Sequence, residues 1–196
     1  MIDTIVLMLK TDEFRITDHN RFNPSTVGLF EEPLYPLNKG SYKCTQNPTQ
    51  KEFIADGKYR PRLTVTRRLP YNPLRVDLRI EFSVPKLLFN SNFVEVSNHD
   101  FDEIINTLRE RLKEMGVQVF RHFLIGAHVS AIHYSKNIVL EDFMTSSMVI
   151  SMISKAKMNS ALDLNRTDFR NGGQSIKYHA NSYEIAIYDK IRDIQQ

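Results

Sequence analysis

Tyr188 and Lys190, two residues apart near the end of the sequence, are the first residues whose types and spacing suggest chemistry. Residues 182–190 alternate between two sets of side chains, as a half-buried strand does. On such a strand Tyr188 and Lys190 would be neighbours on one face. A phenol can act as a nucleophile when a nearby ammonium stabilises the phenolate or the phosphate that it attacks. The alternative interpretation is a core strand with an amphipathic tyrosine at its rim.

A second group of candidate residues lies between residues 58 and 79, where seven basic side chains accompany one acidic side chain. Tyr59 and Tyr71 are interleaved with them. Arginine clusters with aromatic neighbours suit a phosphate backbone and unstacked bases. A solvated strand edge that is protected by charge is the alternative interpretation. The arginines that we expect to contact DNA are Arg60, Arg62, Arg67 and Arg68.

The strand predicted at residues 76–83 would present some of these groups. It alternates strictly, so one face is apolar and the other carries Asp77, Arg79 and Glu81. Two carboxylates that flank an arginine are unremarkable on a solvated sheet surface. On a face that also carries a reactive tyrosine, they could hold a metal ion or a phosphate.

The remaining pattern predicts the scaffold. Further strands are expected at residues 2–9, 42–46, 62–68, 118–123, 127–139, 174–179 and 182–190. Loops are expected at residues 11–38, with room for one short element, and at residues 159–171. Residues 100–116 predict a helix with a capping box at Asp100 and Glu103 and a glycine stop at Gly116. Residues 140–157 predict a second helix. This order predicts an α+β fold, with a mainly antiparallel central sheet and two principal helices, in a single domain of residues 1–196.

Composition excludes several classes of protein. The chain is 41% hydrophobic and 25% charged with a net charge of +3, and no apolar run approaches the roughly 20 residues of a membrane span. A single cysteine, Cys44, excludes an intramolecular disulfide framework and a cysteine-based zinc cluster, which fits a reducing cytoplasm. There is no glycine-rich phosphate loop and no zinc-spaced histidine set. On a regular strand His128 and His133 face opposite ways, so they are not expected to share one ion.

Four segments, taken together, resemble the gene-II replication initiators of filamentous phages and their plasmid and prophage relatives. They are MIDTIVL at residues 1–7, LRIEFSVPKLL at residues 78–88, VSAIHYS at residues 129–135 and IYDKI at residues 187–191. The third segment is similar to a strand in which many such initiators have Arg-Ile-Asp, and His133 takes the place of the Asp. The chain lacks the two-histidine strand and the helical Tyr-x-x-Lys of the HUH endonucleases, so their metal triad is not predicted.

The resemblance implies a Rep-nickase-like fold and a rolling-circle replication initiator, a site-specific DNA endonuclease that nicks and rejoins origin DNA. Tyr188 would form a covalent 5′-phosphotyrosine, with Lys190 as its charge partner. Glu81 and His133 would hold Mg²⁺ or Mn²⁺. Lys86 and Lys136 would join the arginines of the basic segment in binding DNA. The expected partners are single-stranded or supercoiled origin DNA and the host replication machinery, in the cytoplasm of a bacterial host.

Two other functions remain open at this point. The chain could be a non-catalytic regulator that binds origin DNA, or a phage structural protein with an accidental Tyr-x-Lys. Gene-II-type initiators are considerably longer than 196 residues. The sequence is therefore expected to be either a catalytic-domain fragment or a compact relative. The presence of the tyrosine segment favours the enzyme over the regulator.

Overall fold

The structure is a computed structural model that describes residues 2–30, 40–47, 55–69, 75–156, 163–170, 175–180 and 183–191. The chain forms two compact units, Met1–Asn137 and Ile138–Gln196, and each is described by itself. That the two units act as one catalytic domain stays a prediction.

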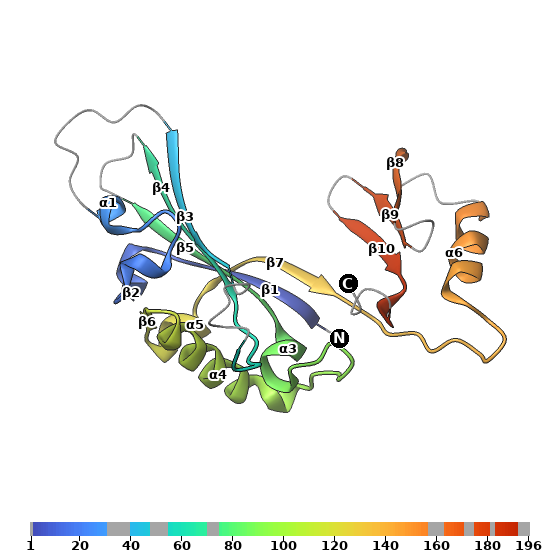
Figure 1. Ribbon diagram of the computed structural model, residues 1–196, viewed down its shortest axis with the longest axis horizontal. Coiled ribbons are helices and arrows are strands. Elements are labelled where there is room, and N and C mark those ends of the chain that lie inside the picture. Colours follow the sequence, from blue (N-terminus) through green and yellow to red (C-terminus); the bar gives the residue numbers. More distant parts are fainter. Residues whose placement is uncertain are drawn as a thin grey trace. The chain divides into compact units, whose positions relative to one another are not determined.

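A five-stranded antiparallel sheet organises the first unit, with the strand order β3-β4-β5-β1-β7 (Figure 1). Its strands are β1 (Ile2–Leu9), β3 (Gly40–Gln46), β4 (Arg62–Leu69), β5 (Val76–Ser83) and β7 (His128–Tyr134). Each coincides with a predicted strand to within two residues, except that β7 ends five residues before the predicted strand 127–139. β5 shows why: apolar and polar residues alternate along it and all four of its apolar residues are buried. Pro85 then lies in the first turn of a short helix, α3 (Val84–Phe89).

Helices cover one side of this sheet. α3, α4 (Phe101–Glu114) and α5 (Arg121–Ile125) lie together there (Figure 1). The stripe Ile105, Leu108 and Leu112 of α4 is buried in one core cluster with Leu78 and Ile80 of β5. The sheet and α4 therefore form the two layers of an α+β unit.

The ends of α4 lie within two residues of the predicted ends, but the predicted capping box at the first end does not form. Gly116 follows the helix with φ +75°, and a Cβ there would lie 2.7 Å from the Cβ of Asp18, so the position requires glycine. At the other end Asp100 makes no side-chain cap. Ser97 caps a 3-10 turn, Asn98–Asp100, that leads into the helix, and its backbone N–H donates to the Asp100 carboxylate at 2.7 Å.

Two predictions in the first unit are wrong. The segment predicted as a strand at residues 118–123 divides into β6 (Val117–Val119) and α5, because the chain turns at Phe120. The described part of the predicted loop 11–38 contains β2 (Phe14–Ile16), which pairs with β6, a short helix α1 (Val27–Phe30), and two 3-10 turns at Thr11–Glu13 and His19–Arg21. Residues 31–38 of that loop lie outside the described residues.

The described residues of the second unit include a three-stranded antiparallel sheet and the helix α6 (Ser146–Lys155). The sheet order is β10-β9-β8, with β8 (Asp163–Arg170), β9 (Ser175–His179) and β10 (Glu184–Tyr188). The helix α6 begins later than predicted, where the Thr145 hydroxyl accepts a bond from the Met148 N–H at 3.2 Å. β8 occupies a segment for which the sequence predicts a loop. Ile150, Ile176 and Tyr178 form the core.

The α+β class and the mainly antiparallel sheet are confirmed. The two predicted principal helices correspond to α4 and α6. A closer likeness to replication nickases stays a prediction. In the described ranges, none of the helices has the length and apolar character needed to cross a membrane.

Candidate functional site

The five-stranded sheet has a second face that is opposite its hydrophobic core. Residues paired directly across antiparallel strands share a face, and the register therefore assigns each strand position to one side. The polar face, as we call it, comprises Lys43 and Thr45 of β3; Arg62, Thr64 and Thr66 of β4; Asp77, Arg79, Glu81 and Ser83 of β5; Thr4, Val6 and Met8 of β1; and His128, Ala131 and His133 of β7. None of them belongs to the hydrophobic core cluster of the first unit.

Glu81 and His133, the two predicted metal ligands, both lie on the polar face. Glu81 stands opposite Val6 of β1, and His133 stands opposite Thr4 of the same strand. The carboxylate of Glu81 is half-buried and accepts a hydrogen bond from Arg79 at 2.5 Å. His133 is exposed on an edge strand. The sheet thus brings these two side chains to one surface, on opposite flanks of β1.

The separation of these two residues limits how they can hold a metal. A strand spacing of about 4.8 Å, applied across β1, puts their Cα atoms roughly 10 Å or more apart. A carboxylate and an imidazole are suitable donors for Mn²⁺ or Mg²⁺ in type. Both side chains would have to lean over β1 to share one ion. In the part of the chain that the structure describes, no three His, Cys, Asp or Glu side chains gather closely enough to hold a metal.

His128 also lies on the polar face, contrary to the prediction from regular alternation. The pairing of β7 with β1 shifts by one residue between Val6 and Leu7, so a bulge returns His128 to the side of His133. The two histidines stand opposite Met8 and Thr4, four residues apart on β1, which is about 13 Å. They therefore share a face without sharing a site.

Tyr188 is the last residue of β10 in the second unit. It stands opposite Ser175, on the same face as Ala186, whereas Ile187 packs toward the core of that unit. Its side chain is 44% exposed, so the phenol is accessible. The predicted strand is confirmed for residues 184–188, but its burial does not alternate as predicted, because Ile185 is 41% exposed. The predicted position of Lys190 is wrong. The strand ends at Tyr188 and Lys190 has helical backbone, so the two side chains are not neighbours on one strand face.

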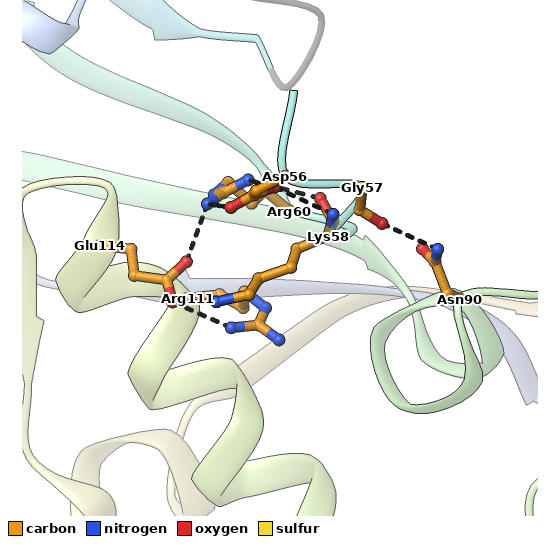
Figure 2. Close-up of polar contacts among 7 residues, drawn as sticks. All are labelled: Asp56, Gly57, Lys58, Arg60, Asn90, Arg111 and Glu114. Atoms are coloured by element: carbon orange, nitrogen blue, oxygen red, sulfur yellow. Dashed lines mark hydrogen bonds and ion pairs between the residues drawn. The ribbon is translucent and has the colours of Figure 1, made fainter. Parts of the chain in front are cut away.

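Arg60 has a structural role in place of the predicted DNA contact. It is 5% exposed, and its guanidinium donates two hydrogen bonds to Asp56, at 2.8 and 2.5 Å. A third bond, at 3.0 Å, reaches Glu114 at the end of α4 (Figure 2). Glu114 also pairs with Arg111 at 3.0 Å. The Arg60 network, defined by these four residues, fixes the start of β4 to the end of α4. The hydrogen bonds from Arg60 hold the pKa of Asp56 well below its usual range.

Arg67 is also buried, at 2% exposed, because it falls on the core side of β4 with Leu63 and Val65. Its guanidinium donates to the backbone carbonyl of Leu29 at 3.1 Å. A phosphate on the surface does not reach this group. Arg68 has its backbone in β4, and its side chain lies outside the described residues.

The other predicted DNA-binding residues are accessible. Arg62 is exposed, and its Nε donates to the amide oxygen of Asn47 at 3.0 Å. Lys136 is exposed and lies 3.4 Å from a carboxylate oxygen of Glu95. Lys86 is half-buried in α3. Only Arg62 of these three lies on the polar face.

Tyr59 is a structural side chain, whereas Lys43 is a surface cation that the sequence pattern does not single out. The Tyr59 phenol oxygen accepts a hydrogen bond from the Ser83 backbone N–H at 2.7 Å, and burial raises the pKa of the phenol. It is therefore not a stacking platform for bases. Lys43 is exposed on β3, opposite Thr66. Its strand is predictable, but the side that it faces depends on the pairing of β3 with β4.

Comparison with known proteins adds no constraint to this arrangement. No family model, curated protein or solved structure matches the chain.

Proposed function

We propose that the protein is a rolling-circle replication initiator, a metal-dependent nickase and strand transferase that acts on origin DNA through Tyr188. The observation that supports the proposal is the shared face of Glu81 and His133, which the resemblance to gene-II initiators requires of its two metal ligands. The accessible phenol of Tyr188 is the second support.

The proposed step is a transesterification. The Tyr188 Oη attacks the scissile phosphorus and forms a phosphotyrosine ester, the bond from phosphorus to the 3′ oxygen breaks, and the phenolic proton is transferred so that the 3′ oxygen leaves as a hydroxyl. The 5′ phosphate remains on the protein, and the 3′-hydroxyl is available to a host polymerase. Reversal by a 3′-hydroxyl restores the phosphodiester without ATP, because one ester bond replaces another.

Charge stabilisation in this step falls to a few groups. Glu81 and His133 would hold Mg²⁺ or Mn²⁺, whose contribution when bound is to polarise the phosphate. The resemblance assigns Lys190 to offset negative charge on the phenolate or the phosphate, and this role does not depend on a shared strand face.

The test is a search for a covalent adduct. The protein is incubated with a labelled origin oligonucleotide and Mn²⁺ or Mg²⁺, and the mixture is separated on a denaturing gel. We expect a labelled band at the mass of the protein plus DNA, absent from Tyr188→Phe. Tyr183→Phe is the matched control, because Tyr183 is an exposed tyrosine of the same segment, and it should retain the adduct. An adduct of equal yield in Tyr188→Phe would refute the nucleophile.

The second candidate is a regulator that binds origin DNA without cutting it. The observation in its favour is that the described residues contain no cluster of three metal-ligating side chains. For this function we expect retardation of DNA on a native gel, and no adduct with any divalent metal. An adduct that depends on Tyr188 would exclude it.

A further inference from the structure

We propose that single-stranded DNA binds across β3 and β4 on the polar face, with Lys43 and Arg62 as the cations that neutralise its phosphates. The inference rests on the proposed function only in taking DNA as the partner. It replaces the DNA contacts predicted for Arg60 and Arg67, which are buried elsewhere in the unit.

The charges of the polar face carry the first part of the argument. The Asp77 carboxylate lies 2.9 Å from the Nε of Arg75, and the Glu81 carboxylate lies 2.5 Å from Arg79. Both acids of the face are therefore offset by an arginine. Lys43 and Arg62 are exposed, and neither pairs with a carboxylate of the described residues. Among the described residues, Lys43 and Arg62 are therefore the cations of the face that no carboxylate offsets, and both lie on its β3–β4 side.

Hydroxyl groups fill the space between the two cations. Positions 62, 64 and 66 of β4 follow one another on the polar face, and Lys43 stands opposite Thr66. The row is therefore Lys43, Thr66, Thr64 and Arg62, about 14 Å from end to end by strand geometry. Thr64 and Thr66 are half-buried, so their hydroxyls lie close to the sheet surface. Lysine, arginine and threonine are among the side chains that bind phosphate oxygens in DNA complexes.

The form of the row favours a single strand that is bound through its backbone. The face carries no tyrosine or phenylalanine from the described parts of β3 or β4, because Tyr42 falls on the other side, opposite Arg67. Stacking of bases therefore does not drive binding at this row. A single strand can follow the row from one cation to the other. The backbone of a duplex curves away from such a shallow surface after a few phosphates. Binding should thus be independent of sequence and sensitive to salt.

The experiment compares two pairs of substitutions that remove the same charge. Lys43→Ala with Arg62→Ala removes the cations of the row. Arg109→Ala with Lys113→Ala removes two cations from α4, which packs on the opposite face. Binding of a fluorescent single-stranded oligonucleotide of mixed sequence is measured by anisotropy over a range of salt concentrations. Thermal melts confirm that both variants are folded.

We expect the row variant to bind roughly tenfold or more weakly, since a charged hydrogen bond contributes about 1.5–3 kcal/mol before surface screening. The slope of log affinity against log salt should fall by about 1.4, or about 0.7 for each phosphate that is no longer neutralised. The α4 variant should match the wild type. Equal decreases in affinity for both variants, or an unchanged affinity for the row variant, would overturn the proposal. Equal affinity for a blunt duplex would overturn its assignment to a single strand.

Adduct formation by the same samples separates this inference from the proposed nickase. If the wild type forms the Tyr188 adduct but the row variant binds DNA normally, the surface is wrong and the nickase stands. If the row variant no longer binds DNA and the wild type forms no adduct, the surface stands and the nickase is wrong.

Discussion

Removal of the Arg60 guanidinium should destabilise the first unit and leave DNA binding intact. Arg60 is buried and makes three hydrogen bonds to two carboxylates, so Arg60→Ala removes the bridge that it forms between Asp56 and Glu114 (Figure 2). The sequence pattern alone assigns this residue to DNA. The stability of the variant therefore distinguishes the two roles directly.

The expected cost is about 3 kcal/mol. Removal of one member of a fully buried ion pair typically costs about 3–5 kcal/mol. The Asp56 and Glu114 side chains are 36% and 33% exposed, so water would solvate them again and the cost falls toward the lower limit. The aliphatic stem of Arg60, which is buried with the guanidinium, adds a packing contribution. For a unit of this size, about 3 kcal/mol corresponds to a decrease in Tm of roughly 10 °C.

Urea unfolding followed by far-UV circular dichroism measures this change, because the chain has no tryptophan to report by fluorescence. Arg62→Ala is the matched control. It is an exposed arginine two residues away with one hydrogen bond to an amide, and it should change stability by less than about 0.5 kcal/mol. Glu114→Ala combined with Arg60→Ala should cost less than the sum of the two single changes. A stable Arg60→Ala variant with DNA affinity reduced tenfold would refute the structural role.

Three further predictions concern single groups. The pKa of Asp56 is lower in the folded than in the unfolded protein, so the contribution of its carboxylate to stability is complete above the unfolded pKa of about 3.9 and decreases as the pH falls below that value. The difference in Tm between wild type and Asp56→Asn should therefore shrink from pH 5 to pH 3. A constant difference would contradict the ion pair. Glu81→Gln should release Arg79, abolish the adduct and retain single-stranded DNA binding in an anisotropy assay; an adduct of normal yield would exclude Glu81 from the reaction. Cys44 is buried with a raised pKa, so it should react with a thiol reagent only after urea unfolds the protein, and rapid labelling of the native protein would contradict that burial.

The sequence predicts the strands and α4 of the first unit well because their signals are local. β5 alternates over eight residues, and the stripe of α4 repeats at helical spacing, so each pattern identifies its own buried side. For β8 the sequence predicts a loop, because the segment Asp163–Arg170 is polar and has no alternation of apolar residues. Its pairing with β9, which no local signal indicates, makes it a strand.

The arginines of the basic segment also differ in how far the sequence indicates their roles. Arg67 has the same parity as Leu63 and Val65, so alternation in the sequence already indicates the core side of β4. The charge of the segment conceals that signal. For Arg60 one partner, Asp56, lies only four residues away, but the sequence does not indicate its burial, because its second partner Glu114 lies 54 residues away. A basic segment can therefore combine structural and accessible cations, and the pairing of its strands decides which are which.

The pairing of β1 also links the two halves of the polar face. Arg79 stands opposite Met8, and Glu81 stands opposite Val6, so the ion pair of these two residues lies between the Lys43–Arg62 row and the histidines of β7. A phosphate that binds the Arg79 guanidinium competes with the Glu81 carboxylate for it. The negative charge of Glu81 is then less neutralised. An uncompensated carboxylate attracts a divalent cation more strongly than one already paired with an arginine. If DNA occupies Arg79, the binding of DNA and of Mn²⁺ on this face should therefore be mutually favourable, since linkage makes such a coupling reciprocal.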